Sequence, residues 1–326
     1  QTQSFLLQVV GLDSYEQLQS TLYRVYEVRY GDRTQRFSER DVDAAGRLMG
    51  REEAERLAEK RMILLKARGF EPELTALDVP QTAVYVQSNT GTLQALDAET
   101  GQTLWTVSVG NPRYPMSAPA ANDRFVATVN GSSLYLLDRI TGEPIWDRPL
   151  DINPSPELTM SGQYVFVPSL TGLLNGYRLP DAEGDYRGAQ PWAYGSGGRL
   201  TGAPSIAGPT ISWSSTNGHL FVATLEGPSV LYRHHTNGPV ESRVALIPPD
   251  RLVFATRDGY VTALDAITGA AKWYFSAGVD ITKQPLVNAE NTLVVSRDNQ
   301  LFCINSEDGS EMWVARGVSQ VLSVGA

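Results

Sequence analysis

The sequence predicts an all-β fold, a β-propeller of four-stranded blades preceded by a small N-terminal α/β extension. A unit of about 41 residues recurs along the chain, and each copy ends in an aromatic residue. Each copy holds short runs rich in β-branched and aromatic residues, and polar turns separate these runs. The 326 residues also include 29 glycines and 19 prolines, a content that suits many tight turns.

The repeat is clearest at the motif Ala-Leu-Asp-x-x-Thr-Gly-x-x-x-Trp. Four segments carry it: ALDAETGQTLW (95–105), LLDRITGEPIW (136–146), ALDAITGAAKW (263–273) and CINSEDGSEMW (303–313). Two degenerate copies end at Trp192, after an insertion over residues 181–190, and at Tyr232. A large flat ring at the end of each copy is suited to wedge between neighbouring blades. The predicted blade-docking residues are therefore Trp105, Trp146, Trp192, Tyr232, Trp273 and Trp313.

A second position supports the register of the six copies. A glycine or asparagine precedes the final aromatic by 14 residues at Gly91, Gly218, Gly259 and Asn299. The interval is 15 residues for Gly131 and, because of the insertion, 20 residues for Gly172. Five residues before this position each copy has an apolar residue: Val86, Val126, Val167, Trp213, Phe254 and Val294. Matched registers at two separate positions indicate a true internal repeat.

Within one copy, the pattern predicts four strands joined by turns. In the Asp-x-x-Thr-Gly turn, the Asp side chain is suited to accept hydrogen bonds from backbone N–H groups, and the Gly permits a positive φ. Asp97, Asp138 and Asp265 are therefore expected to be turn residues and not Ca²⁺ ligands. Because a single four-stranded sheet cannot bury both of its faces, successive sheets are expected to pack against each other.

The motif resembles the PQQ-type, or tryptophan-docking, propeller repeat over residues 74–326. Carriers of this repeat include quinoprotein alcohol dehydrogenases and BamB-like proteins of outer-membrane β-barrel assembly, so the resemblance implies a fold more strongly than a function. The dehydrogenases are much longer and have a vicinal cysteine pair beside the quinone, whereas Cys303 is the single cysteine here. The sequence departs from the repeat in the third copy, where Asn175-Gly176-Tyr177 replaces the Asp turn, and in the fourth, which ends in Tyr232.

Residues 1–73 do not follow the repeat and form the predicted extension. A helix over residues 15–22 is expected after Ser14, and a second helix is expected to begin near Ser38 and to end at Gly69. The apolar stripe of the second helix, which is expected to dock on the propeller or on a neighbouring protein, consists of Ala54, Leu57, Ala58, Met62 and Leu65. Strands are predicted over residues 4–10, 23–30 and 34–38, the last two joined by a turn at Gly31-Asp32.

The repeat stops shortly after Trp313. Residues 319–326, with the sequence SQVLSVGA, stand where the first strand of a further blade is expected. The propeller over residues 74–326 is therefore predicted to hold six full blades and the start of a seventh. Two explanations stay open: the sequence is part of a longer protein, or the N-terminal strands complete the last blade. Seven blades is the favoured count, with eight as the alternative.

Composition narrows the class of partner. The formal net charge is −9 and the pI about 5.0, which disfavours binding to the phosphate backbone of nucleic acids. No apolar run reaches about 18 residues, the length expected of a membrane-spanning helix. Because the chain begins at Gln1 and not at Met, a removed signal peptide is expected, and this favours the periplasm, the cell envelope or the extracellular space.

No catalytic, cofactor-binding or metal-binding residues are predicted. The chain has three histidines, His219, His234 and His235, and adjacent side chains such as those of His234 and His235 point apart on a strand. Joint chelation of a metal by that adjacent pair is therefore disfavoured. Cys303 is expected to be a buried structural thiol within a strand. The sequence has no nucleophile elbow, P-loop or dinucleotide-binding fingerprint.

The two irregular copies are the predicted place for contact with a partner, because loops on a rigid scaffold often carry function. Tyrosine, tryptophan and arginine are enriched at binding hot spots. The candidate partner-binding residues in and near the insertion and in the fourth copy are Tyr186, Arg187, Trp192, Tyr194 and Tyr232.

The predicted function is that of a non-catalytic scaffold that binds other proteins in a bacterial cell envelope, such as members of a membrane-associated complex. Two alternatives stay open. One is an enzyme of the quinoprotein type that binds PQQ or another ligand in the central funnel. The other is a glycan-binding or structural component of a larger surface assembly.

Overall fold

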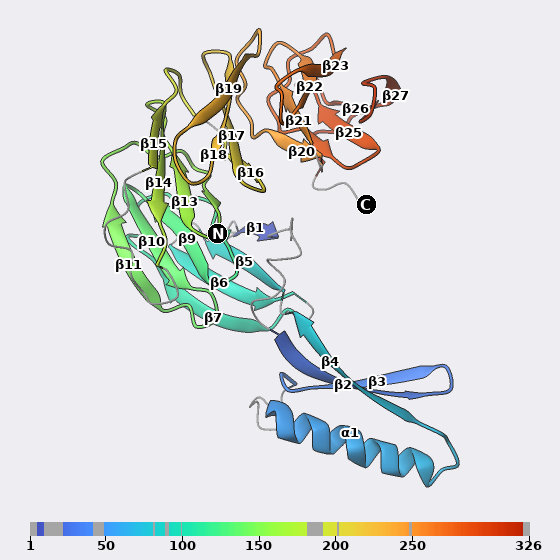
Figure 1. Ribbon diagram of the computed structural model, residues 1–326. Coiled ribbons are helices and arrows are strands. Elements are labelled where there is room, and N and C mark those ends of the chain that lie inside the picture. The colour runs from blue at the N-terminus through green and yellow to red at the C-terminus, as the bar shows by residue number, and fades with distance from the viewer. Residues whose placement is uncertain are drawn as a thin grey trace. The chain divides into compact units, whose positions relative to one another are not determined.

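The computed structural model describes residues 5–9, 22–41, 49–80, 82–88, 91–98, 100–180, 192–200, 202–247 and 250–321 (Figure 1). The chain divides into two compact units. One comprises Gln1–Gln8, Gln87–Leu93 and Val107–Ala326, and the other comprises Val9–Val86 and Gln94–Thr106. No helix in the described part of the chain has both the length and the apolar character needed to cross a membrane.

Strands of the described residues form six four-stranded sheets and one three-stranded sheet. The four-stranded sheets are blades 1 to 6, named in chain order. Blade 1 has the order β1 (Phe5–Val9), β5 (Ala83–Ser88), β6 (Thr92–Asp97), β7 (Thr103–Ser108). Blade 2 consists of β8 (Ala120–Ala121), β9 (Phe125–Asn130), β10 (Ser133–Asp138) and β11 (Pro144–Pro149). Blade 3 consists of β12 (Thr159–Met160), β13 (Tyr164–Pro168), β14 (Leu173–Arg178) and β15 (Trp192–Gly195).

Blades 4 to 6 repeat the same order of strands. Blade 4 consists of β16 (Ser205–Ala207), β17 (Thr210–Ser215), β18 (His219–Thr224) and β19 (Val230–His235). Blade 5 consists of β20 (Ala245–Ile247), β21 (Arg251–Ala255), β22 (Tyr260–Asp265) and β23 (Ala271–Ser276). Blade 6 consists of β24 (Leu286–Val287), β25 (Asn291–Val295), β26 (Gln300–Asn305) and β27 (Glu311–Arg316).

From blade 2 to blade 6, each pair of consecutive blades shares one hydrophobic cluster. The cluster between blades 2 and 3 contains Leu136 of β10 together with Met160 and Val165 of the next sheet. Corresponding clusters join blades 3 and 4, blades 4 and 5, and blades 5 and 6. Burial of these apolar faces drives successive sheets to pack face to face. The predicted propeller of four-stranded blades is therefore confirmed.

One detail of the predicted repeat is wrong. Asn175, Gly176 and Tyr177 do not form a turn but lie within β14, where they pair with β13 and β15. Gly176 stands directly opposite Trp192, and a Cβ at this glycine would lie 2.9 Å from atoms of both Phe166 and Trp192. The missing side chain therefore makes room for two large rings.

The N-terminal extension is a three-stranded antiparallel sheet with one helix. The sheet has the order β3 (Arg33–Ser38), β2 (Leu22–Tyr30), β4 (Glu73–Pro80), and the helix is α1 (Gly50–Lys66). Tyr26 and Val28 of β2 pack with Ala54, Ala58 and Leu65, which are members of the predicted apolar stripe. The expectation that this stripe docks on the propeller or on a neighbouring protein is therefore wrong, because most of it packs on the extension's own sheet. The helix also begins at Gly50 and not near Ser38, which is the last residue of β3.

The sequence predictions for the two ends of the chain and for the domain boundary have different outcomes. Of the two explanations left open for the last blade, completion by the N-terminal strands is wrong, because β1 joins blade 1 while β2 pairs with β3 and β4. Residues 74–80, which were predicted to belong to the propeller, lie in β4 and pair with β2 in the extension's sheet. Residues 319–321 form no strand, and residues 322–326 lie outside the described residues. Of the helix predicted over 15–22, residues 15–21 lie outside the described residues, and Leu22 is the first residue of β2.

Candidate functional site

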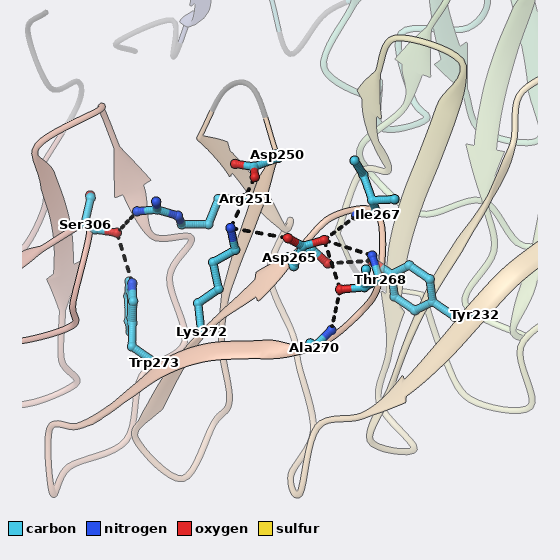
Figure 2. A network of polar contacts seen from close by, with 10 residues as sticks. All are labelled: Tyr232, Asp250, Arg251, Asp265, Ile267, Thr268, Ala270, Lys272, Trp273 and Ser306. Carbon is cyan, nitrogen blue, oxygen red and sulfur yellow. Dashed lines mark hydrogen bonds and ion pairs between the residues drawn. The ribbon is translucent and has the colours of Figure 1, made fainter.

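The Asp-x-x-Thr-Gly turn after β22 is held together by its own side chains (Figure 2). One carboxylate oxygen of Asp265 accepts hydrogen bonds from the backbone N–H groups of Ile267 at 3.0 Å and Thr268 at 2.9 Å, and from the Thr268 hydroxyl at 3.0 Å. The bonds from Thr268 lower the pKa of Asp265 to about 2. The equivalent aspartates, Asp97 and Asp138, accept the same bonds from their own turns, so the predicted turn role is confirmed.

Two of the predicted docking aromatics contact the turn of the following blade. The hydroxyl of Tyr232 donates a 2.9 Å hydrogen bond to the carbonyl of Ala266, and burial raises the pKa of this tyrosine to about 12. Trp273 Nε1 donates a 3.0 Å hydrogen bond to the carbonyl of Ser306. A Cβ at the turn glycines, Gly269 and Gly309, would lie 2.8 Å from the respective aromatic ring. Each glycine therefore supplies both the positive φ and the space that the ring occupies.

The other predicted docking aromatics have different surroundings. Trp105 is buried in blade 1, with its ring 5.9 Å from that of Tyr85. Trp146 lies under the guanidinium of Arg148, and its Nε1 has no hydrogen-bond partner among the described residues. Trp313, in the last described strand, is 46% exposed.

A continuous group of rings lies between blades 3 and 4. This aromatic cluster consists of Phe166, Trp192, Tyr194, Trp213 and Phe221. Trp213 is at its centre: its ring stacks on Phe221 at 5.3 Å and lies 5.8 Å from Trp192. Its Nε1 donates a 2.8 Å hydrogen bond to the hydroxyl of Ser196. The repeat held a signal for this residue, because Trp213 replaces the smaller apolar residue of the other copies at the same position.

The cluster continues to the protein surface through histidines. The His219 ring lies 6.1 Å from Phe221 and 5.4 Å from His235, the residue directly opposite it on β19. His234 belongs to the other face of the sheet, where its ring contacts Phe254 at 6.0 Å. The adjacent pair His234-His235 is visible in the sequence, but the cross-strand pair of His219 and His235 is not, because cross-strand neighbours depend on the register of two strands.

Comparison with known proteins decides the family. Residues 58–220 and 212–325 match the sequence profile of the family described as outer membrane protein assembly factor BamB. The chain belongs to the BamB family. This relationship confirms the resemblance based on the tryptophan repeat.

One sequence relative agrees with the BamB assignment, and two solved structures agree with the propeller fold. The outer membrane protein assembly factor BamB of Burkholderia pseudomallei (strain K96243) is 27% identical over 241 residues, which cover 65% of this chain and 58% of that relative. The crystal structure of BamB from Moraxella catarrhalis has a TM-score of 0.60 at 17% identity, with 72% of this chain and 70% of that chain covered. The C-terminal WD40 domain of Sif2 has a TM-score of 0.61 at 12% identity, covering 77% and 78% of the two chains. At these identities the structural matches support the propeller fold alone.

In this BamB-family chain, the candidate partner-binding residues fall into three groups. Trp192 and Tyr194 come together in the aromatic cluster, where Trp192 is 2% exposed and Tyr194 is half-buried. Tyr232 packs on the Asp-x-x-Thr-Gly turn of blade 5, where its hydroxyl donates a hydrogen bond to the carbonyl of Ala266. Tyr186 and Arg187 lie outside the described residues.

Proposed function

We propose that this BamB-family chain is a non-catalytic scaffold that binds other proteins in a bacterial cell envelope. The carboxylates of the turn aspartates Asp138 and Asp265 are engaged by backbone N–H groups of their own turns. Membership in the BamB family supports partners that take part in outer-membrane protein assembly, and a place in the periplasm. The net charge of −9 further favours protein partners over nucleic acids.

The rim of the aromatic cluster is the surface proposed for partner contact. The half-buried Tyr194, on β15, and the exposed Arg233, on β19, are of residue types that are enriched at binding hot spots. Packing of Tyr194 against Trp213 at 5.5 Å and Phe221 at 5.4 Å holds its ring in place. A ring that is already fixed loses little side-chain entropy on binding, which favours affinity.

Affinity purification of the full chain from native membranes tests this function. Specific partners are expected to be recovered in stoichiometric amounts with the wild-type chain and lost with the double variant Tyr194→Ser, Arg233→Glu. Tyr274→Ser is the matched control, because Tyr274 is an exposed tyrosine of the outer strand β23. Near-ultraviolet circular dichroism checks that all variants remain folded. A wild-type chain that stays monomeric and recovers no stoichiometric partner would contradict the proposal.

A further inference from the structure

Two histidines face each other at one end of the strand pair β18–β19 in blade 4. His219 is the first residue of β18 and His235 the last residue of β19, and the two are directly opposite in the antiparallel register. Their ring centroids are 5.4 Å apart, with an interplanar angle of 83°. Two strands of one sheet hold both side chains, so the pair is organised before any ligand binds.

Each imidazole of the pair has an asparagine beside its Nδ1. Asn217 Oδ1 lies 3.2 Å from Nδ1 of His219, and Asn237 Oδ1 lies 3.0 Å from Nδ1 of His235. The orientation of the Asn217 amide is fixed, because its Nδ2 donates a 3.0 Å hydrogen bond to the carbonyl of Ser196. The oxygen that faces His219 can only accept, so Nδ1 of this ring carries the proton and Nε2 keeps a free lone pair.

The second imidazole has two contacts at the same nitrogen. The closer one is to Asn237 Oδ1 at 3.0 Å, and the backbone N–H of Asn237 lies at 3.3 Å. The backbone N–H donates to an unprotonated Nδ1, whereas the Asn237 oxygen accepts from a protonated one, so the two contacts require opposite tautomers. Metal binding through Nε2 requires the tautomer with the proton on Nδ1, which the shorter contact stabilises. A histidine that donates its other ring N–H to an oxygen has the usual arrangement of a metal ligand and its supporting residue.

We propose that His219 and His235 form a two-histidine site for a divalent transition-metal ion of the Zn²⁺, Ni²⁺ or Cu²⁺ class, with water at the other coordination positions. Imidazole nitrogens suit these ions. Two such nitrogens, each about 2 Å from one ion, place their ring centroids about 5 Å apart, and the observed separation of 5.4 Å matches this spacing. Among the described residues, no group of three or more histidine, cysteine or carboxylate side chains is placed to hold a metal ion, so the protein supplies two ligands here.

One charged side chain near the pair opposes metal binding. Arg233 lies on the same strand as His235, two residues before it, and its guanidinium acts on His219. A guanidinium repels a bound cation and therefore limits the affinity. The third histidine, His234, packs on Phe254 on the other face of the sheet and is a natural control.

Isothermal titration of the untagged full chain with ZnCl₂, repeated with NiCl₂, tests this site. The wild-type chain and His234→Gln are expected to bind one equivalent with equal affinity. His219→Gln and His235→Gln are each expected to lose about tenfold or more in affinity. Binding that does not saturate, or that is unchanged in both of these variants, would overturn the site.

Two further variants separate a built site from a pair of independent surface histidines. Asn237 has a φ of 58°, so Asn237→Gly keeps the backbone conformation and removes only the supporting oxygen. This variant is expected to weaken binding about tenfold. Arg233→Gln removes the opposing charge and is expected to tighten binding several-fold. Thermal melts without metal check that each variant is folded. If neither variant changes the affinity for the metal, the supporting role of Asn237 and the opposing role of Arg233 are wrong.

Discussion

The hydroxyl of Tyr232 donates a hydrogen bond to the carbonyl of Ala266 in the next blade, and the same ring covers Gly269. Trp273 repeats this relationship on Ser306 and Gly309, one blade further along the chain. At these two places, the terminal aromatic of one copy therefore packs on the turn glycine of the next copy. This contact links each blade to the blade that follows it.

Gly269→Ala is expected to destabilise the protein by about 2–4 kcal/mol, because the added methyl group requires both a strained φ and displacement of the Tyr232 ring. Gly101→Ala is the matched control: Gly101 also has a positive φ, but a Cβ there meets nothing within 4 Å. The control is expected to cost about 1 kcal/mol from backbone strain alone. Urea denaturation measures both, and equal losses would show that the ring contact contributes nothing.

Acid is expected to weaken the turn after β22. The folded-state pKa of Asp265, about 2, lies below its ordinary value of 3.8, so its stabilising effect is fully present above that value and is lost as the pH falls through about 2. Asp265→Asn is therefore expected to lower the urea midpoint at pH 5, and the difference from the wild type is expected to shrink between pH 4 and pH 2. A difference that does not change with pH would show that the carboxylate charge has no part in holding the turn.

Local chemistry explains why much of the fold could be predicted from the sequence. In the Asp-x-x-Thr-Gly turn, the Asp side chain accepts hydrogen bonds from backbone N–H groups of the same turn. Because all partners lie within a few residues, the motif predicts the turn wherever it occurs in the sequence. β4 was missed because its partner β2 is distant in the sequence and nothing in the sequence ELTALDVP distinguishes it from a blade strand.

The pairing of His219 with His235 could not be predicted from the sequence either, because it depends on strand register. The register of β18 and β19 shifts between Val222 and Ala223, and this irregularity contributes to which residue of β19 stands opposite His219. A slip of one residue would place His234 there instead of His235 and would turn the intervening side chains to the other face. The sequence therefore supplied the residues of this site but not their pairing.

The hydrogen bond between Trp213 and Ser196 is expected to stabilise the aromatic cluster independently of ring packing. In a double-mutant cycle of Trp213→Phe and Ser196→Ala, the coupling free energy is expected to be about 1 kcal/mol, since both groups are buried and the bond is 2.8 Å long. Denaturant unfolding of the four proteins measures it. Strictly additive losses would mean that the two side chains do not depend on each other.

Gly176→Ala is expected to cost about 1–3 kcal/mol, because its methyl group would press on Phe166 and Trp192 in the aromatic cluster. Ala263, the residue opposite Trp273 in blade 5, shows that an alanine fits this position where no second ring competes for the space. Gly162→Ala, at a glycine with nothing within 4 Å of its added Cβ and no positive φ, is expected to be close to neutral. Thermal melting compares the two variants, and a neutral Gly176→Ala would mean that the rings can move apart freely.

Trp273 and Trp313 occupy the same position in consecutive copies but differ in exposure, at 5% and 46%. Trp273→Ala is expected to cost about 3–5 kcal/mol, because it removes a buried ring and its hydrogen bond to Ser306. Trp313→Ala is expected to cost less than half as much, since a half-exposed ring gains little from burial. Urea denaturation of the 326-residue chain gives both values. Because the chain has six tryptophans, the difference in acrylamide quenching between the wild type and Trp313→Ala provides the independent measure of the exposure of Trp313. If the two losses are equal and Trp313 is protected from acrylamide, another segment must cover this ring in solution.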